Sequence, residues 1–210
     1  MTTIITIDDH PLFRKGLAQL IEMDGKLELV GEAASGKEGI SLATELNPEL
    51  ILLDLNMAGM DGIETLQHLK AADVDSQIVM LTVSDNEEDL VAAIRAGADG
   101  YLLKDMEPED TLEYINKALN GEMVISNRLT SLLAHALKAE NKIPDTATQA
   151  GLTDRELQIV KLIAQGNSNK VIARNLNIVE STVKVHVKHA LKKLKLKSRV
   201  EIAVWATNNL

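Results

Sequence analysis

The chain has 210 residues, of which 45% are hydrophobic and 25% charged, and its formal net charge is -9 at pH 7. This length and composition suit a globular protein with two small hydrophobic cores. The lack of cysteine excludes disulfides, thiolate zinc sites and cysteine nucleophiles, and the lack of long apolar runs and of a signal peptide predicts a cytoplasmic protein with no membrane partner.

The first 120 residues alternate between short apolar, β-branched runs and amphipathic segments. The expected strands are Thr3 to Ile7, Leu27 to Glu32, Leu50 to Leu55, Gln77 to Val83 and Gly100 to Leu103. The amphipathic segments begin near Pro11, Lys37, Gly62, Asn86 and Pro108. Five such β-α units predict an α/β fold, a doubly wound five-stranded parallel sheet of flavodoxin type with strand order 2-1-3-4-5.

Acidic residues stand at the ends of two of these strands. Asp8 and Asp9 end the first strand, and Asp54 ends the third. The carboxyl ends of these two strands meet at the functional crevice of such a sheet, and the fourth and fifth strands bring Thr82 and Lys104 to the same edge. Clustered carboxylates repel each other unless a cation binds, and Mg2+ suits such oxygen ligands. The alternative is that each aspartate only caps a helix or turns the chain.

Four motifs in this half, "IDDHP", "LLDLNMAGMDG", "LTVS" and "GYLLKD", resemble the receiver domain of two-component response regulators, in this order and spacing. The match covers roughly Thr3 to Asn120. One departure is Ala58, which stands where the family usually has proline and loosens a turn.

This resemblance implies that Asp54 accepts a phosphoryl group from a cognate sensor histidine kinase, so the chain is not a turnover enzyme. It assigns the other positions by role: Mg2+ ligands Asp8, Asp9, Asp54 and the backbone carbonyl of Asn56; switch residues Thr82 and Tyr101; and Lys104 paired with the phosphoryl group. Tyr101 has an alternative reading as ordinary packing at the sheet edge.

The charge is divided unevenly along the chain. From Gly151 onward there are eleven Lys and Arg against four Asp and Glu, a charge of +7, whereas the preceding residues have eleven against twenty-seven, a charge of -16. The polar segment "KAENKIPDTATQAG" (Lys138 to Gly151) separates them. We expect a phosphoacceptor domain at residues 3–120, a linker with a probable helix at 121–147, and a basic module suited to a polyanion at 148–210.

The basic module is expected to hold four helices. Thr153 and Glu156 form a capping-box signature for the first helix, and Gly166 punctuates its end. A short second helix starts at Ser168 or Asn169, and a third starts near Glu180. This order predicts a helix-turn-helix, whose third helix enters the major groove of double-stranded DNA.

The third helix contains the strongest concentration of positive charge in the chain. The segment Lys184 to Lys197 holds six lysines. Lys184, Lys188, Lys192 and Lys195 fall on one stripe, while apolar residues such as Val183 and Leu194 face a core. Like charges at this spacing do not stabilise an isolated helix, so the stripe suits contact with phosphates. The alternative is a solvated, lysine-rich face.

This half resembles the four-helix, all-α LuxR-type DNA-binding domain, and the combination resembles the NarL/FixJ family of response regulators. Within that family, "GADGYLLKDMEPED" and "ESTVKVHVKHALKKLKLKSRVEIAVW" resemble nitrate/nitrite regulators of the NarL/NarP type. The likeness implies a transcription factor that binds DNA as a homodimer when phosphorylated. It implies base contacts by Lys184, Val185 and Lys188, and phosphate contacts by Lys192 and neighbouring lysines such as Lys195.

Other classes of function fit less well. A haloacid-dehalogenase-like phosphatase normally has a second acid two residues after its nucleophile, where this chain has Asn56, and a dinucleotide-binding module needs G-x-G-x-x-G after the first strand. A receiver-like interaction module that regulates transcription without phosphorylation remains an alternative. The charge asymmetry also suggests that the unphosphorylated receiver covers part of the Lys184 to Lys195 stripe.

Overall fold

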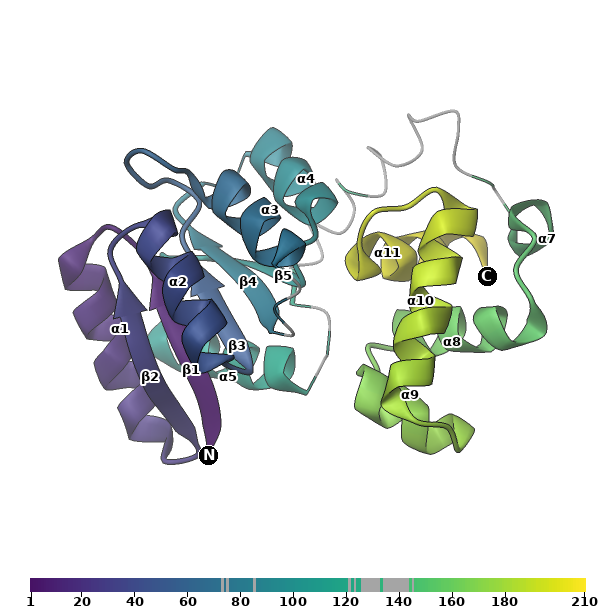
Figure 1. The fold of residues 1–210 in the computed structure, drawn as a ribbon, viewed down its shortest axis with the longest axis horizontal. Coiled ribbons are helices and arrows are strands. Elements are labelled where there is room, and N and C mark those ends of the chain that lie inside the picture. The colour runs from purple at the N-terminus through teal and green to yellow at the C-terminus, as the bar shows by residue number, and fades with distance from the viewer. Residues whose placement is uncertain are drawn as a thin grey trace.

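The computed structural model describes residues 1–72, 74, 76–84, 86–120, 122, 124, 125, 133, 144 and 146–210, which form two modules (Figure 1). Most of the linker expected at residues 121–147, with its probable helix, lies outside the described residues. Within the described part of the chain, no helix has both the length and the apolar character of a membrane span.

The first module contains a five-stranded sheet. Its strands are β1 (Thr2–Ile7), β2 (Leu27–Ala33), β3 (Leu50–Leu53), β4 (Gln77–Thr82) and β5 (Gly100–Leu103). All are parallel, and their order β2-β1-β3-β4-β5 confirms the predicted topology. Because Ile7 pairs with Leu53 across β1 and β3, the residues that follow these two strands emerge at the same level.

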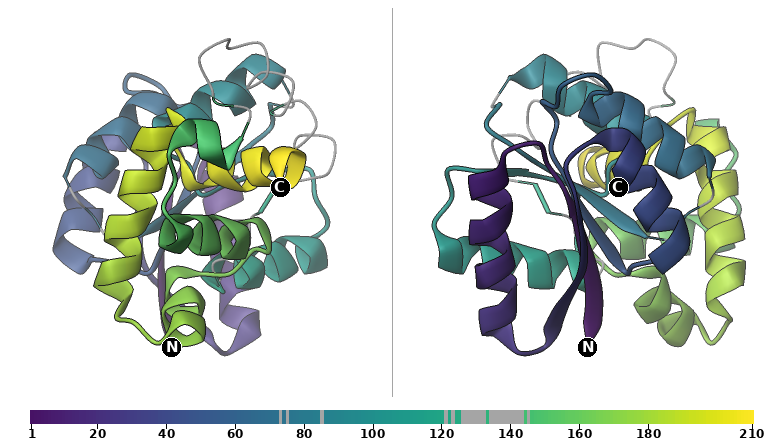
Figure 2. Two further views of the ribbon diagram at one scale, coloured as in Figure 1. Left: turned by 90° about the vertical axis from the view of Figure 1, so that its right-hand side faces the viewer. Right: turned by 60° about the vertical axis from the view of Figure 1, so that its left-hand side comes forward.

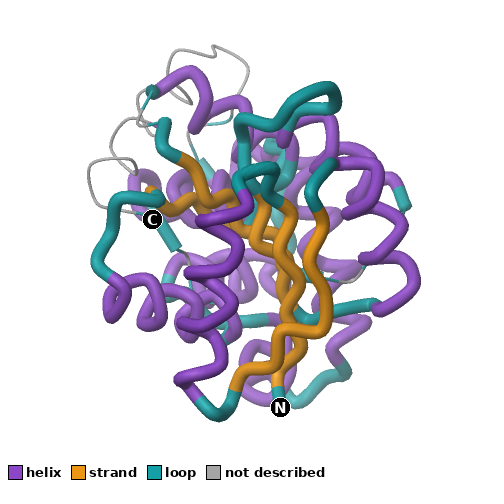
Figure 3. Tube along the Cα trace, turned by 90° about the vertical axis from the view of Figure 1, so that its left-hand side faces the viewer, coloured by secondary structure: helices purple, strands orange, loops and turns teal. Residues whose placement is uncertain are grey.

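Helices cover both faces of this sheet (Figures 1 and 3). They are α1 (Pro11–Asp24), α2 (Gly36–Leu46), α3 (Gly62–Ala71), α4 (Glu87–Ala96) and α5 (Pro108–Leu119). Alternate residues of β1 serve different cores: Ile4 packs with α1 and α5, whereas Ile5 and Ile7 pack with α2, α3 and α4. Two covered faces explain why β3 is buried along its whole length.

The second module is helical, with α7 (Ala147–Ala150), α8 (Asp154–Ala164), α9 (Asn169–Leu176), α10 (Glu180–Leu194) and α11 (Arg199–Asn209). The capping box of Thr153 and Glu156 opens α8 as predicted. The Ser168 hydroxyl accepts a hydrogen bond from the Val171 N–H at the start of α9. Helices α8 to α11 are the four expected ones, and α7 is an addition that the sequence did not predict.

The two modules are in contact in this structure, and the helices of the second lie in front of the sheet of the first in Figure 2 (left). Seven consecutive residues of α11, from Val200 to Ala206, are buried. A helix is buried on every side only if it has neighbours on every side, and here α8 and the α4 helix of the first module both contact it. The core beside α2, α3 and α4 therefore continues into the second module.

Candidate functional site

An acidic pocket lies at the carboxyl ends of β1 and β3. Asp8 and Asp54 are only 4% and 2% exposed. The Asp54 N–H donates a 2.8 Å hydrogen bond to the Ile7 carbonyl, which joins the end of β3 to β1. Asp9 Oδ2 accepts a 2.9 Å hydrogen bond from the Ala58 N–H, so the loop after β3 is held against the acids. The fold thus brings together three carboxylates from distant parts of the chain.

Lys104 reaches this pocket from the end of β5. Its Nζ lies 2.7 Å from Asp8 Oδ2 and 2.8 Å from Asp54 Oδ2, and its side chain is only 7% exposed. The ammonium also lies 4.7 Å from the centroid of the Phe13 ring, within cation-π range. The Lys104 N–H donates a 2.8 Å hydrogen bond to the Thr82 carbonyl, which fixes the backbone position from which the Lys104 side chain extends. One buried cation therefore links two of the three carboxylates.

Burial raises the pKa of the Asp54 carboxyl, and the nearby Lys104 ammonium opposes this shift only in part. Among the described residues, Asp9 Oδ1 and Asp54 Oδ2 are buried oxygens that accept no hydrogen bond. Asp54 Oδ2 instead forms an ion pair with Lys104 Nζ at 2.8 Å, and Asp9 Oδ1 lies 2.9 Å from His10 Nδ1. A cluster of buried carboxylate oxygens of this kind suits a divalent cation with oxygen ligands.

The expected switch residues meet through Ser84. Thr82 is fully buried, and its Oγ1 accepts hydrogen bonds from the Ser84 N–H at 3.1 Å and the Asn56 side-chain amide at 3.4 Å. Tyr101 is 1% exposed, and its hydroxyl donates to the Ser84 carbonyl at 3.0 Å. Any movement of the Thr82 loop therefore acts on a residue that also holds the Tyr101 ring in its buried position.

Two side chains at this pocket had no role in the sequence-based prediction. His10 Nδ1 lies 2.9 Å from Asp9 Oδ1, and the Arg14 guanidinium donates to the Asp8 carbonyl. The motif "IDDHP" contains His10, but only the fold shows that its ring turns toward the acids. Asn56 is exposed, and its N–H donates to Asp54 Oδ1 at 3.3 Å.

A second candidate site is the outer face of α10. Its core-facing residues Val183, Ala190 and Leu194 are fully buried. The predicted DNA-contacting residues are all exposed: Lys184, Val185, Lys188, Lys192 and Lys195. The helix ends at Leu194, and Lys195 is its left-handed C-cap residue with φ 59°. Lys195 was expected to lie on the helix with the other three lysines, but it lies one residue beyond the helix end. Its side chain is nevertheless exposed, as theirs are.

Lys193 differs from its neighbours on α10. Its Nζ lies 2.6 Å from Glu156 Oε2 on α8, and the Glu156 side chain is only 4% exposed. Burial would raise the pKa of Glu156, but bonds from Lys193 and Thr153 outweigh it and lower the pKa. Lys193 thus joins two helices of the module, and it is not part of the exposed lysine face.

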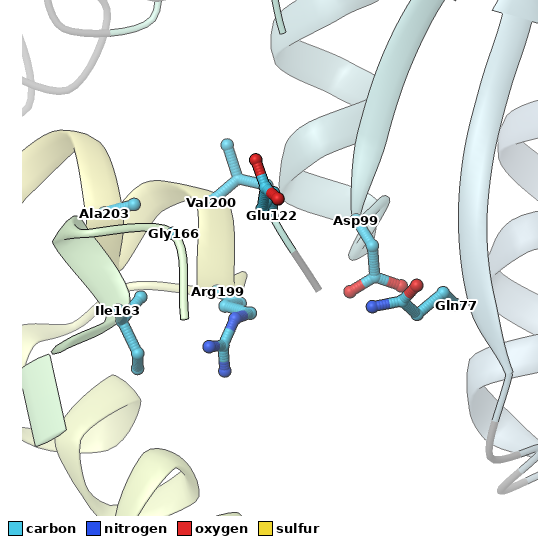
Figure 4. A pocket seen from close by; sticks show the side chains of 8 residues that line it. All are labelled: Gln77, Asp99, Glu122, Ile163, Gly166, Arg199, Val200 and Ala203. Atoms are coloured by element: carbon cyan, nitrogen blue, oxygen red, sulfur yellow. The ribbon is translucent and has the colours of Figure 1, made fainter. Parts of the chain in front are cut away.

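The expected cover over the lysine stripe is not observed, because its side chains are exposed and the first module instead contacts α11. Arg95 Nε on α4 lies 3.9 Å from Glu201 Oε1 on α11. Burial lowers the pKa of Arg199 to about 10, and the Asp99 carboxylate partly opposes this shift. Figure 4 shows the small pocket at this contact, which is lined by Gln77, Asp99, Glu122, Ile163, Gly166, Arg199, Val200 and Ala203.

Both modules match known families. Residues 4–116 match the response regulator receiver domain, and residues 150–206 match the luxR family of bacterial regulatory proteins. The chain is 58% identical over 203 residues to the nitrate/nitrite response regulator protein NarL of Escherichia coli K12, covering 97% of this chain and 94% of that protein. It is 46% identical to NarP of the same strain, covering 96% and 92%. The crystal structure of the response regulator ChrA of a heme-sensing two-component system superimposes with a TM-score of 0.53 at 29% identity, covering 98% and 96%.

Proposed function

The chain belongs to the two-component response regulators that join a receiver domain to a LuxR-family DNA-binding domain, and we propose that phosphorylation of Asp54 controls its activity as a transcription factor for nitrate- and nitrite-responsive genes. The observation that carries the proposal is the buried Asp54 carboxylate, 2.8 Å from the Lys104 ammonium at the carboxyl edge of the sheet. This arrangement sets a buried carboxylate beside a cation that can balance the charge of a transferred phosphoryl group.

The chemistry follows from the charges around Asp54. The phosphorus-nitrogen bond of a phosphohistidine on the sensor kinase breaks as an Asp54 oxygen bonds to phosphorus, and the histidine nitrogen keeps the electron pair. Lys104 faces the transferred group and balances its charge. Asp8, Asp9, Asp54 and the Asn56 carbonyl would hold Mg2+, which would neutralise charge on the phosphoryl oxygens. The acyl phosphate later hydrolyses, so the signal is limited in time.

The signal then has to pass from Asp54 to the contact between the two modules. Thr82 lies at the carboxyl end of β4, while Gln77, the first residue of the same strand, lines the pocket between the modules. Helix α4 follows the Thr82 loop and ends near Arg95, which faces Glu201 on α11. We infer that a phosphoryl oxygen draws the Thr82 hydroxyl away from Ser84 and that the resulting shift of α4 weakens its contact with α11.

The freed DNA-binding module then binds double-stranded DNA. Lys184, Val185 and Lys188 contact base edges in the major groove, and Lys192 and Lys195 contact phosphates. One helix reads too few base pairs for selectivity in a genome, so the phosphorylated protein binds paired half-sites as a homodimer. Its partners are DNA and a sensor histidine kinase, and it acts in the cytoplasm. We assign nitrate and nitrite as the stimulus because the chain is 58% identical to NarL.

Labelling with phosphoramidate or acetyl phosphate in the presence of Mg2+ tests the phosphoacceptor. One phosphoryl group per chain is expected on the wild type and none on Asp54→Asn; labelling that survives the substitution would refute the assignment. A reporter gene under a nitrate-responsive promoter tests the stimulus. If Asp54 is labelled but the reporter ignores nitrate and nitrite, the phosphorylation mechanism stands and the assigned stimulus is wrong.

A further inference from the structure

The ring of His10 faces the acidic pocket from the start of α1. We propose that His10 supplies a nitrogen ligand to the cation in this pocket, and that the site therefore binds Mn2+ in preference to Mg2+. This inference rests on the proposed metal site formed by Asp8, Asp9 and Asp54. It adds a residue that determines which ion the site selects.

The spacing of the possible ligand atoms supports this role. His10 Nδ1 lies 2.9 Å from Asp9 Oδ1, 3.3 Å from Asp8 Oδ1 and 3.7 Å from Asp54 Oδ2. One ligand atom from each of these four residues falls within a group whose members are all within 4.8 Å of one another. Adjacent ligands of an octahedral ion with bonds of about 2.1 Å lie roughly 3.0 Å apart. The nitrogen therefore stands at ligand spacing from three different carboxylates.

Hydrogen bonding does not account for this arrangement. His10 Nδ1 lies near two buried oxygens, Asp9 Oδ1 and Asp54 Oδ2, neither of which accepts a hydrogen bond from it, and Asp54 Oδ2 is also paired with the Lys104 ammonium at 2.8 Å. A ring N–H that served as an ordinary donor would point along one N–H···O line. Instead, the nitrogen and one oxygen of each carboxylate form a cluster within 4.8 Å, a spacing that ligands around one ion can adopt.

The ring is also free of any other structural task among the described residues. Its side chain is 66% exposed. His10 is the N-cap residue of α1, but its side chain makes no capping bond there. The backbone is held separately, because the His10 N–H donates to Asp8 Oδ1 at 2.8 Å and its carbonyl accepts from the Arg14 N–H at 3.1 Å. Substitution of His10 should therefore remove the imidazole and leave the fold intact.

The chemistry of the two ions explains the selectivity. Mg2+ is a hard ion that prefers oxygen ligands and retains several waters, so water readily replaces a missing imidazole. Mn2+ also accepts carboxylates, but as a first-row transition metal it gains more than Mg2+ from an imidazole nitrogen. Loss of His10 should consequently weaken Mn2+ binding more than Mg2+ binding.

The test uses metal-free, full-length, unphosphorylated protein at one fixed pH. Mn2+ affinity is measured from the electron paramagnetic resonance signal of free Mn2+, and Mg2+ affinity by calorimetry. His10→Ala should weaken Mn2+ binding about tenfold and weaken Mg2+ binding by a clearly smaller factor. Electron spin echo modulation of bound Mn2+ should show a directly bonded nitrogen in the wild type and none in His10→Ala. The matched control is Asp9→Ala, which should weaken binding of both ions.

Several outcomes would overturn the inference. An equal loss of Mn2+ and Mg2+ affinity in His10→Ala would mean that His10 only positions the acids. Tighter binding of both ions would mean that the ring competes with the ion for the carboxylates. Wild-type spectra without a bonded nitrogen would exclude ligation. If Asp9→Ala also leaves both affinities unchanged, the proposed metal site itself is wrong, and that result is distinct from failure at His10 alone.

Discussion

Arg95 and Glu201 form an ion pair between the two modules, with Arg95 Nε on α4 3.9 Å from Glu201 Oε1 on α11. The Glu201 side chain is only 2% exposed. Its Oε2 accepts the Lys197 and Ser198 N–H groups at the start of α11. The Arg95 guanidinium on the receiver therefore faces the start of α11, where the Glu201 carboxylate is already held by backbone N–H groups. Arg95 is a better residue to substitute than Glu201, because Glu201 also belongs to the capping box of α11 and its loss would disturb that helix.

Arg95→Ala should shift the unphosphorylated protein toward separated modules, because it removes the cation that faces the buried Glu201. Small-angle X-ray scattering should show a larger radius of gyration, and Trp205 on α11 offers a fluorescence reporter. Lys15→Ala on α1 removes the same charge from an exposed position and is the control. Equal dimensions for wild type and Arg95→Ala would show that the pair does not hold the modules together.

The exposed lysines of α10 should differ in their role in DNA binding, some contacting phosphates and others contacting bases. Lys192→Ala should weaken binding to specific and random DNA alike and lower the salt slope by about one, as expected for a phosphate contact. Lys188→Ala should lose roughly 1–3 kcal/mol of discrimination between sequences, as expected for a base contact. Salt titrations on both kinds of duplex measure this. If the two variants behave identically on both kinds of duplex, Lys188 and Lys192 do not have the different roles assigned to them.

Lys193→Ala should destabilise the DNA-binding module by about 1–3 kcal/mol, because Glu156 would remain buried without its charged partner. Since the folded-state pKa of Glu156 is below the usual 4.5, its contribution is present above pH 4.5 and is lost as the pH falls below that value. Thermal unfolding at neutral and acidic pH should therefore show a difference between wild type and variant that shrinks in acid. Lys192→Ala, next in sequence and exposed, should leave stability unchanged.

Asp54→Asn should stabilise the metal-free protein at neutral pH. The folded-state pKa of Asp54 is above 3.8, so the folded protein binds the proton more tightly than the unfolded chain and loses stability as the pH rises above 3.8. The advantage of Asp54→Asn should grow over the same range. Mg2+ at a hundred times its Kd should stabilise the wild type by about 2.7 kcal/mol and the variant by less. Equal stabilisation would place the ion elsewhere.

Thr82→Ala should separate phosphorylation from its effect on DNA binding. Asp54 and Lys104 remain in place, so labelling should persist, while the hydroxyl that the phosphoryl oxygen attracts is gone. The increase in DNA affinity on phosphorylation should shrink about tenfold, in line with a coupling of 1–3 kcal/mol. Thr82→Ser retains the hydroxyl and should keep most of the coupling. If Thr82→Ala behaves as wild type, the switch does not run through this residue.

The sequence alone determined the strands, the sheet order and the four helices of the second module. Strong local signals explain this success: β3 is apolar along its length until it meets Asp54, and Thr153 with Glu156 marks the start of α8. In a flavodoxin-type sheet of order 2-1-3-4-5 the carboxyl ends of β1 and β3 are adjacent, so the meeting of Asp8, Asp9 and Asp54 at one edge was predictable once that fold type was expected.

Only the tertiary structure decided how individual side chains are used. Lys192 and Lys193 are neighbours of the same type, yet Lys193 faces Glu156 across two helices while Lys192 points to solvent. The ring of His10 turns toward three carboxylates, and the receiver contacts α11 and leaves the lysines of α10 exposed. These outcomes depend on packing between segments far apart in the chain, and net charge and periodicity contain no information about such distances.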